Sequence, residues 1–205
     1  MGQVNTTRDF PVIESIDVAV YQIPTDAPEA DGTLAWSSTT MVVVQVHAGG
    51  EMGLGWTYAG SGSATVVAET LIDRCVGMSA FDVTGANERM ARACRNLGRP
   101  GVVSSAISAV DIALWDLKAR LLSLPLASLF GQVRAQAPIY GSGGFTTYDE
   151  PQARGQLEKW VDEWHIPRVK MKIGESWGTN VQRDCSRVAF ARKVIGDTTE
   201  LYVDA

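Results

Sequence analysis

The sequence predicts an α+β capping domain, an antiparallel sheet followed by helices, and then the first part of a TIM-type (β/α) barrel, truncated after its third strand. Three observations support this prediction. Strand patterns fill the first sixty residues, helix patterns fill the next seventy, and strands alternate with helices after Pro138. Strands and helices segregated along a chain are typical of α+β folds, whereas alternation is typical of parallel sheets. We place the two domains at residues 1–133 and 134–205.

The sheet of the first domain is expected from three segments. Residues 13–23 alternate in polarity, residues 39–47 are rich in β-branched side chains, and residues 51–58 return as a third strand after the turn signal Gly49-Gly50. A polar segment, residues 24–38, lies between the first two strands and contains two prolines. We predict a loop there, and loops of this length often act as lids.

Three helices are expected to follow. They span residues 63–77, 86–97 and 104–122, and glycines close the first two. The third has the clearest pattern, because apolar residues recur at helical spacing until Pro125 ends it. The recurring residues are Ile107, Val110, Leu114, Leu117 and Leu121.

The barrel part begins with a short strand opening at Ile139 and ending in a glycine-rich run. A helix with Pro151 in its first turn, the strand 168–173, a helix ended by Gly196 and a strand at 201–204 follow. The strands start near 138, 168 and 200, and eight units of this length make about 250 residues, the usual size of a TIM barrel. The sequence therefore predicts two βα units and a third strand.

Composition excludes several classes of protein. A net charge of −5 without a Lys/Arg block argues against nucleic acid as a partner, and no apolar run approaches membrane-helix length. The polar N-terminal segment does not read as an export signal, so the three cysteines are expected to be reduced thiols in the cytoplasm. The two histidines lie far apart, which argues against a histidine-rich metal site or a Ser-His-Asp triad.

The run from Arg168 to Ile173 places Lys170 and Lys172 on one face of a strand. Two neighbouring ammonium groups repel, which lowers the pKa of each lysine and makes a general base near neutral pH. The alternative is a solvated edge strand. Asp204 ends the next strand, so the three side chains are expected to converge as a base beside a metal ligand. The alternative for Asp204 is the first residue of a turn.

Three stretches carry a resemblance to a known family: residues 106–120, the Lys170-Met171-Lys172 run, and Val203-Asp204-Ala205. They resemble the signature helix of the capping domain, the Lys-x-Lys base motif and the first metal-binding aspartate of the enolase superfamily, of the mandelate racemase and muconate lactonizing type. The resemblance covers nearly all of the chain, from about residue 12, and corresponds to the N-terminal half of such an enzyme.

The resemblance implies a Mg²⁺ enzyme that removes the proton α to a carboxylate, with a Lys base and Mg²⁺ stabilising an enediolate, as is established for that superfamily. It implies that Lys172 is the base and that Lys170 lowers its pKa and helps to neutralise the substrate carboxylate. It also implies that Asp204 is the first of three carboxylate ligands. Ser142 is a candidate for substrate contact, or part of a tight turn. Residues 24–38 and the glycine-rich turn 53–60 resemble cap loops that close over the substrate.

The expected substrate is a small 2-hydroxy acid or acid sugar, which is racemised or dehydrated by a homo-oligomer. A muconate cycloisomerase or an epimerase of the same superfamily is the alternative. The remaining metal ligands and the opposite-face acid/base come from later strands in this family, so the 205-residue chain alone is expected to be inactive. A second alternative is an oligomerisation module that uses residues 12–130. Asp111, Asp116 and His47 are interpreted as structural.

Overall fold

The computed structural model of the chain describes residues 10–205, so the N-terminal segment in which no export signal is expected lies almost entirely outside the described residues. It has two compact units. The first contains Thr39–Val133 together with the chain before Pro24, and the second contains Pro24–Ser38 together with Arg134–Ala205. None of the described helices is long and apolar enough to cross a membrane.

A three-stranded sheet, in the order β1-β2-β3, opens the fold. β1 spans Ser15–Ala30, β2 spans Ala35–Ala48 and β3 spans Glu51–Tyr58. β2 and β3 are antiparallel, and Val43 lies opposite Trp56 in their register. All three predicted strands are therefore present.

The predicted polar loop at residues 24–38 is wrong, because β1 continues to Ala30 and β2 begins at Ala35. The two strands are joined by a tight turn in which Asp31 Oδ1 accepts hydrogen bonds from the backbone N–H groups of Thr33 (2.7 Å) and Leu34 (2.8 Å). The prolines that suggested a loop lie in β1, which is an edge strand. Edge strands tolerate residues that lack an N–H donor.

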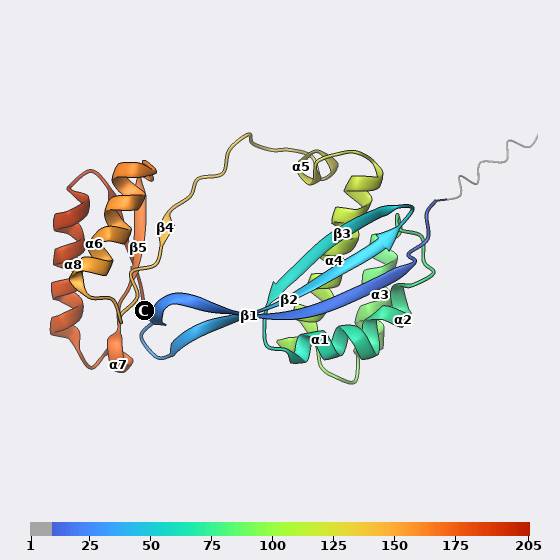
Figure 1. Ribbon diagram of the computed structural model, residues 1–205, viewed down its shortest axis with the longest axis horizontal. Helices are drawn as coiled ribbons and strands as arrows, with labels where there is room; N and C mark the ends of the chain where they lie inside the picture. The colour runs from blue at the N-terminus through green and yellow to red at the C-terminus, as the bar shows by residue number, and fades with distance from the viewer. Residues whose placement is uncertain (1–9) are drawn as a thin grey trace, which may run out of the picture. The chain divides into compact units, whose positions relative to one another are not determined.

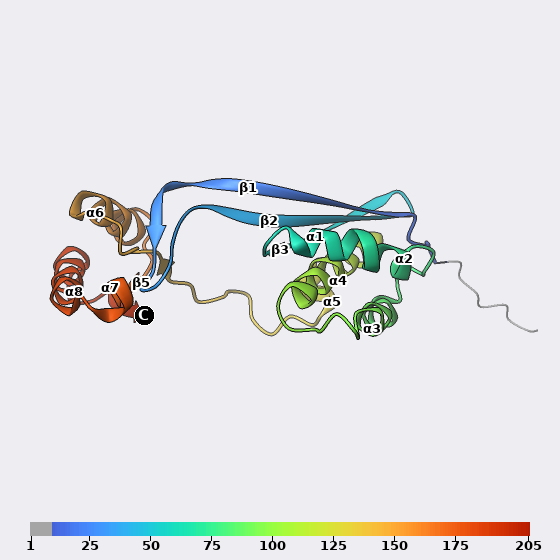
Figure 2. The same ribbon diagram turned by 90° about the horizontal axis from the view of Figure 1, so that it is seen from below.

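The helices of the first unit cover one face of this sheet, as Figures 1 and 2 show. The glycines of β3 make this contact close: a Cβ on Gly53 would lie 2.1 Å from the carbonyl oxygen of Ala113, and one on Gly55 would lie 2.0 Å from that of Ala109. Both glycines belong to a strand packed on α4, so the cap-loop prediction for residues 53–60 is wrong over residues 53–58. The helices are α1 (Gly62–Val66), η1 (Val67–Leu71), α2 (Ile72–Cys75), α3 (Val83–Ala93), α4 (Val102–Leu121) and α5 (Leu126–Leu129).

The second unit contains a parallel sheet in the order β4-β5-β6. β4 spans only Gly141–Ser142, which is shorter than predicted, and Ile139 and Tyr140 are exposed before it. β5 spans Arg168–Lys172 and β6 spans Glu200–Asp204. The helices of this unit are α6 (Glu150–Glu158), η2 (Lys159–Glu163), α7 (Glu175–Gly178) and α8 (Val181–Ile195).

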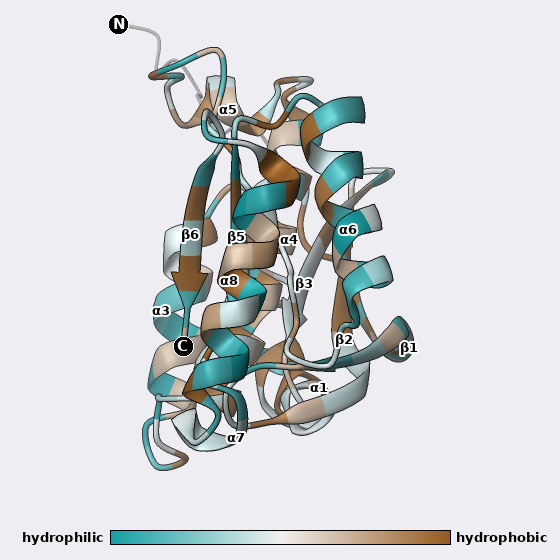
Figure 3. Cartoon of the chain, turned by 90° about the vertical axis from the view of Figure 1, so that its left-hand side faces the viewer, coloured by the Kyte–Doolittle hydropathy of each residue, from teal (hydrophilic) through white to brown (hydrophobic). Residues whose placement is uncertain are grey.

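A separate apolar core lies in this second unit. Val169 and Met171 of β5 are buried together with Leu157 of α6, Trp160 of η2 and Ala191 of α8. Figure 3 shows hydrophilic residues interspersed with apolar ones along α6 and α8. The βαβαβ arrangement predicted for residues 139–204 is therefore present, with the short α7 as an addition.

Candidate active site

β5 alternates between buried and partly exposed residues. Val169 is fully buried and Met171 is 4% exposed, whereas the side chains of Lys170 and Lys172 keep 16% and 21% of their exposure. The two apolar side chains pack toward the helices, so both ammonium groups lie on the opposite face of the sheet. This is the arrangement that the period-two pattern predicts.

Asp204 lies beside the lysine pair on the neighbouring strand. The parallel register places Lys172 opposite Asp204 at the carboxyl ends of β5 and β6. One carboxylate oxygen, Asp204 Oδ2, accepts hydrogen bonds from Lys170 Nζ (2.6 Å) and Lys172 Nζ (2.7 Å). The structure therefore brings together three of the four residues singled out in the sequence.

The electrostatics of this trio differ from the expectation that each lysine lowers the pKa of the other. The pKa of Lys172 is raised, chiefly by its hydrogen bond to Asp204. Hydrogen bonds from Lys170 and Lys172 lower the pKa of Asp204 to about 2. The Asp204 carboxylate binds both ammonium groups, and the residue pattern of β5 alone contains no information about that neighbour.

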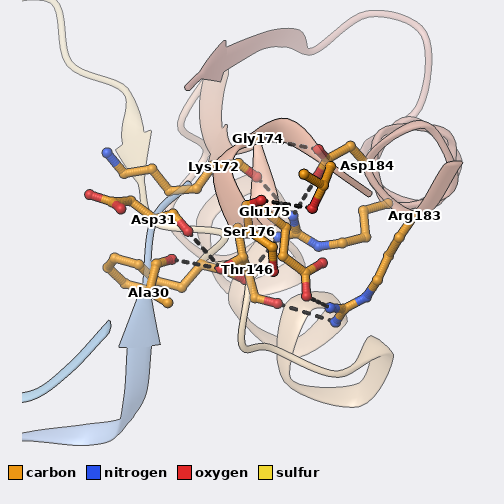
Figure 4. A network of polar contacts seen from close by, with 12 residues as sticks. Ala30, Asp31, Thr146, Lys172, Gly174, Glu175, Ser176, Arg183 and Asp184 are labelled. Carbon is orange, nitrogen blue, oxygen red and sulfur yellow. Dashed lines mark hydrogen bonds and ion pairs between the residues drawn. The ribbon is translucent and has the colours of Figure 1, made fainter. Parts of the chain in front are cut away.

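Asp31 is a fourth charged residue near the lysines, and sequence reasoning missed it. It lies at the tip of the β1–β2 hairpin, and its negative charge contributes to the raised pKa of Lys172. Figure 4 shows its carboxylate beside the Lys172 side chain. The pKa of Asp31 is lowered, first by the hydrogen bonds from the Leu34 and Thr33 backbone. The Asp31-Gly32 dipeptide, a common hairpin-turn signal, was the available clue.

The hairpin tip is held by hydrogen bonds to the segments that follow β4 and β5. Thr146 donates its N–H to the Ala30 carbonyl (2.9 Å) and its hydroxyl to the Asp31 carbonyl (2.9 Å). Trp177 N–H donates to the Gly32 carbonyl (2.8 Å), and a Cβ on Gly32 would lie 2.9 Å from the Gly174 carbonyl oxygen. Figure 4 shows these segments side by side. A side chain at position 32 would displace the tip.

Ser142 lies in β4 and not in a turn. Its register partner is Lys170, so it is placed on the same sheet next to the lysine pair, and the residue is exposed. The chain turns after it, where Gly144 has a φ of +61°. A role in substrate contact stays a prediction.

The polar residues interpreted as structural do have structural partners. Asp116 Oδ2 accepts hydrogen bonds from the Leu54 backbone N–H (2.8 Å) and Arg120 Nε (2.8 Å), which ties α4 to β3. Asp111 accepts a hydrogen bond from Asn87 (2.9 Å). His47 Nε2 lies 3.3 Å from Asp17 Oδ2, and its side chain is 37% exposed, so it is less packed than expected.

The site offers one oxygen ligand of the kind that Mg²⁺ prefers. Asp204 is a carboxylate with a lowered pKa at the end of a strand, which suits a hard cation. Within residues 10–205, no group of three or more His, Cys, Asp or Glu side chains is arranged to hold a metal ion. Asp204 therefore fits as a single ligand, and a complete coordination shell requires oxygen atoms from elsewhere.

Comparison with known proteins agrees with this arrangement. The family profile described as Mandelate racemase / muconate lactonizing enzyme, N-terminal domain, matches residues 15–131. A 3,6-anhydro-alpha-L-galactonate cycloisomerase from Streptomyces coelicolor is 32% identical over 200 residues, which cover 95% of this chain and 54% of that protein.

Two solved structures share the fold. A mandelate racemase/muconate lactonizing enzyme-like protein from Rubrobacter xylanophilus has a TM-score of 0.90 and 48% identity over 95% of this chain and 53% of that one. L-talarate/galactarate dehydratase from Salmonella typhimurium LT2, liganded with Mg and L-lyxarohydroxamate, has a TM-score of 0.86 and 26% identity over 100% of this chain and 54% of that one. The chain thus spans about half the length of these relatives. It belongs to the mandelate racemase and muconate lactonizing enzyme family of the enolase superfamily and corresponds to the N-terminal half of its members.

Proposed function

We propose that this chain carries the proton-abstracting strands of an enzyme that acts on a small carboxylate, a 2-hydroxy acid or an acid sugar. The observation that supports this proposal best is the meeting of Lys170, Lys172 and Asp204 at the carboxyl ends of neighbouring parallel strands. Barrel enzymes hold their catalytic groups at this end. The names of the cycloisomerase and the dehydratase point to acid-sugar chemistry.

In this proposal Lys172 takes the α-proton and Lys170 neutralises the carboxylate of the substrate. Lys172 acts as a base only after its ammonium group has lost a proton, and its hydrogen bond to Asp204 opposes that loss by raising its pKa. The Asp204 carboxylate therefore has to turn toward another partner before the reaction. A bound Mg²⁺, with Asp204 as one ligand, would supply stabilisation of the negative charge that develops on the substrate carboxylate.

The hairpin tip contributes to the same site in this proposal. Asp31 brings a second carboxylate close to Lys172, and the tip is anchored to the loop after β4 through Thr146. In this proposal the tip would limit the access of water to Lys172, which would strengthen the electrostatic interactions there. Residues 24–38, which form the end of the β1–β2 hairpin, keep the proposed role of closing over the substrate, whereas residues 53–58 do not.

The reaction we propose is racemisation or acid-sugar dehydration, and cycloisomerisation or epimerisation within the same superfamily is the alternative. All four share an enediolate intermediate whose α-proton the base removes or returns, so the lysine pair does not separate them. A His-Asp pair on later barrel strands would support the mandelate racemase type, whereas a lysine there would support the muconate lactonizing type. The coding sequence downstream of residue 205 supplies this test.

The assignment of the base predicts the behaviour of Lys172→Ala in a protein that carries the complete barrel. Exchange of the substrate α-proton with deuterated solvent should be lost for the stereoisomer that faces Lys172, while the fold and Mg²⁺ binding are retained. NMR of the substrate measures the exchange. Lys193→Ala, which removes an exposed lysine of α8, is the matched control and should exchange at the wild-type rate. An unchanged rate in Lys172→Ala would falsify the assignment.

A second candidate function, oligomerisation, is favoured by the outer face of the first sheet. Leu54, Trp56 and Tyr58 of β3 are 40%, 53% and 68% exposed, and they alternate with the glycines that pack on α4. Exposed apolar faces of this kind mark interaction surfaces. A module of this type should sediment as a defined assembly, and Trp56→Arg should shift it to a smaller species. Trp164→Arg, at a similarly exposed tryptophan (56%) in the second unit, should not. Polydisperse aggregate in place of a defined assembly contradicts this candidate.

A further inference from the structure

Arg187, on the inner side of α8, is a partly buried arginine whose guanidinium group donates hydrogen bonds to three backbone carbonyls and lies near one carboxylate. Its side chain is 14% exposed. Nη1 donates to the carbonyl of Lys172 (2.8 Å), and Nη2 donates to the carbonyls of Gly144 (2.8 Å) and Phe145 (2.8 Å). One planar side chain thus bridges the segment after β4 and the last residue of β5.

These contacts fix the backbone on both sides of the candidate base. The Gly144 carbonyl that binds Arg187 also accepts the N–H of Lys172 (3.0 Å), and Arg187 itself binds the Lys172 carbonyl. The N–H of Gly144 in turn donates to Gln156 Oε1 of α6 (2.8 Å). Both backbone polar groups of Lys172 are therefore held by one small network, and that network connects β5 to α6 and α8.

Removing the charge of Arg187 from water costs free energy, and Asp184 is the opposite charge that lies nearest to it among the ion pairs of this helix. Burial lowers the pKa of Arg187, with the nearby charge of Arg183 acting in the same direction. Asp184 lies one helical turn away, with Oδ1 3.7 Å from Arg187 Nη1 and Oδ2 accepting the Gly174 N–H (2.9 Å). A buried ion pair is commonly no more stable than apolar residues of the same size, so stability alone is a weak reason for these two charges.

We propose that Arg187 is a positioning residue for proton abstraction: it holds the end of β5 so that Lys172 keeps its place beside Lys170 and Asp204. This inference rests on the proposed function. A guanidinium group suits the task because its donors are arranged in a rigid plane that reaches three carbonyl oxygens at once. A lysine at this position has all its N–H donors on one nitrogen at the end of a flexible stem, so it cannot reproduce contacts that Arg187 makes from two separate nitrogens.

The same helix contains a matched structural arginine. Arg192 Nη1 donates to the carbonyls of Gly196 (2.8 Å) and Thr199 (2.6 Å), which lie in the connection from α8 to the start of β6. Arg192 therefore also holds backbone carbonyls, but at the amino end of a strand, away from the carboxyl ends that carry Lys172 and Asp204. A purely structural role for Arg187 predicts equal effects of the two substitutions on catalysis.

The test compares Arg187→Met, Arg187→Lys and Arg192→Met in a protein that carries this sequence with the complete barrel. Kinetics are measured per folded protein, well below each melting temperature. Arg187→Met should lower kcat and kcat/KM together by about 10- to 100-fold with KM little changed, because misplacing a reacting group by about 1 Å has an effect of this size. The α-proton exchange rate should fall by the same factor, and Arg187→Lys should lie between. Arg192→Met should lose stability but keep kcat.

Several outcomes overturn the proposal. One is a folded Arg187→Met or Arg187→Lys with kcat within about 2-fold of wild type. Another is an equal loss of kcat in Arg192→Met. Failure of both Arg187 variants to fold, while Arg192→Met folds, would assign Arg187 a structural role only. Lys172→Ala is measured in parallel. If that variant keeps its α-proton exchange, the proposed function itself fails. If Lys172→Ala loses the exchange while the Arg187 variants keep the wild-type kcat, only this inference is contradicted.

Discussion

At the scale of single residues, one carboxylate determines the state of the site. Asp204 Oδ2 accepts hydrogen bonds from both lysines, and the one from Lys172 raises the pKa of that lysine, so Lys172 is not poised for deprotonation in the structure. Two lysines on one face lower each other's pKa only when their strand is considered without its neighbours. The neighbouring strand reverses the result because an opposite charge at hydrogen-bond distance outweighs a like charge on the same face.

Asp204→Asn should change how stability depends on acid. Because the pKa of Asp204 in the folded chain is about 2, below the ordinary value, its contribution to stability is fully present above about pH 4 and is lost as the pH falls through about 2. The free energies of unfolding of wild type and Asp204→Asn should therefore converge as the pH falls across this window. The side chain is 38% exposed, so solvent screening keeps the difference modest.

Denaturant unfolding at a series of pH values measures this convergence. Asp197→Asn removes an exposed carboxylate after α8 and is the matched control, with no change expected in the same window. A gap between wild type and Asp204→Asn that stays constant from pH 5 to pH 2 would show that the ion pairs do not persist in solution.

At the scale of secondary-structure elements, the packing of β3 on α4 depends on glycine. A Cβ on Gly55 would lie 2.0 Å from the backbone oxygen of Ala109, which is part of a helix and has no freedom to move aside. Gly55→Ala should destabilise the first unit by roughly 1–3 kcal/mol or more, the usual range for overpacking a core. Gly60→Ala is the matched control, because nothing lies within 4 Å of its added Cβ. Chemical denaturation checks both, and equal stabilities would contradict the close approach.

At the scale of the whole molecule, the 205-residue chain should be inactive by itself and should bind Mg²⁺ weakly. Within residues 10–205 no group of three His, Cys, Asp or Glu side chains is arranged to hold a metal ion, and Mg²⁺ dehydrates reluctantly and requires several oxygen ligands. The two lysines that already occupy Asp204 Oδ2 add competition for that oxygen. Calorimetric titration of the purified chain measures the affinity, with Asp204→Asn as the control, and stoichiometric submillimolar binding that depends on Asp204 would refute the expectation.

The sequence by itself determined the order of the elements and the placement of the trio on adjacent strand ends. The alternation in β5, the helical spacing in α4 and the position of Asp204 in β6 are local patterns, and local patterns follow directly from the period of a strand or a helix. The end of a strand can also be read from the sequence, and it fixes which residues lie at the carboxyl end. The convergence of Lys172 and Asp204 could therefore be predicted from the sequence.

Only the tertiary structure decided what surrounds that trio. Residues 24–38 form the end of a hairpin and not a loop, and the hydroxyl of Thr146 binds the Asp31 carbonyl across 115 positions of the chain. The Arg187 network likewise joins a helix to carbonyls 15 and 43 positions earlier. Such contacts depend on which distant segments meet, and the period of a short segment contains no information about its distant neighbours. The local sequence could therefore place the lysines on one face, but only the folded chain determined the raised pKa of Lys172 and the contacts that hold its backbone.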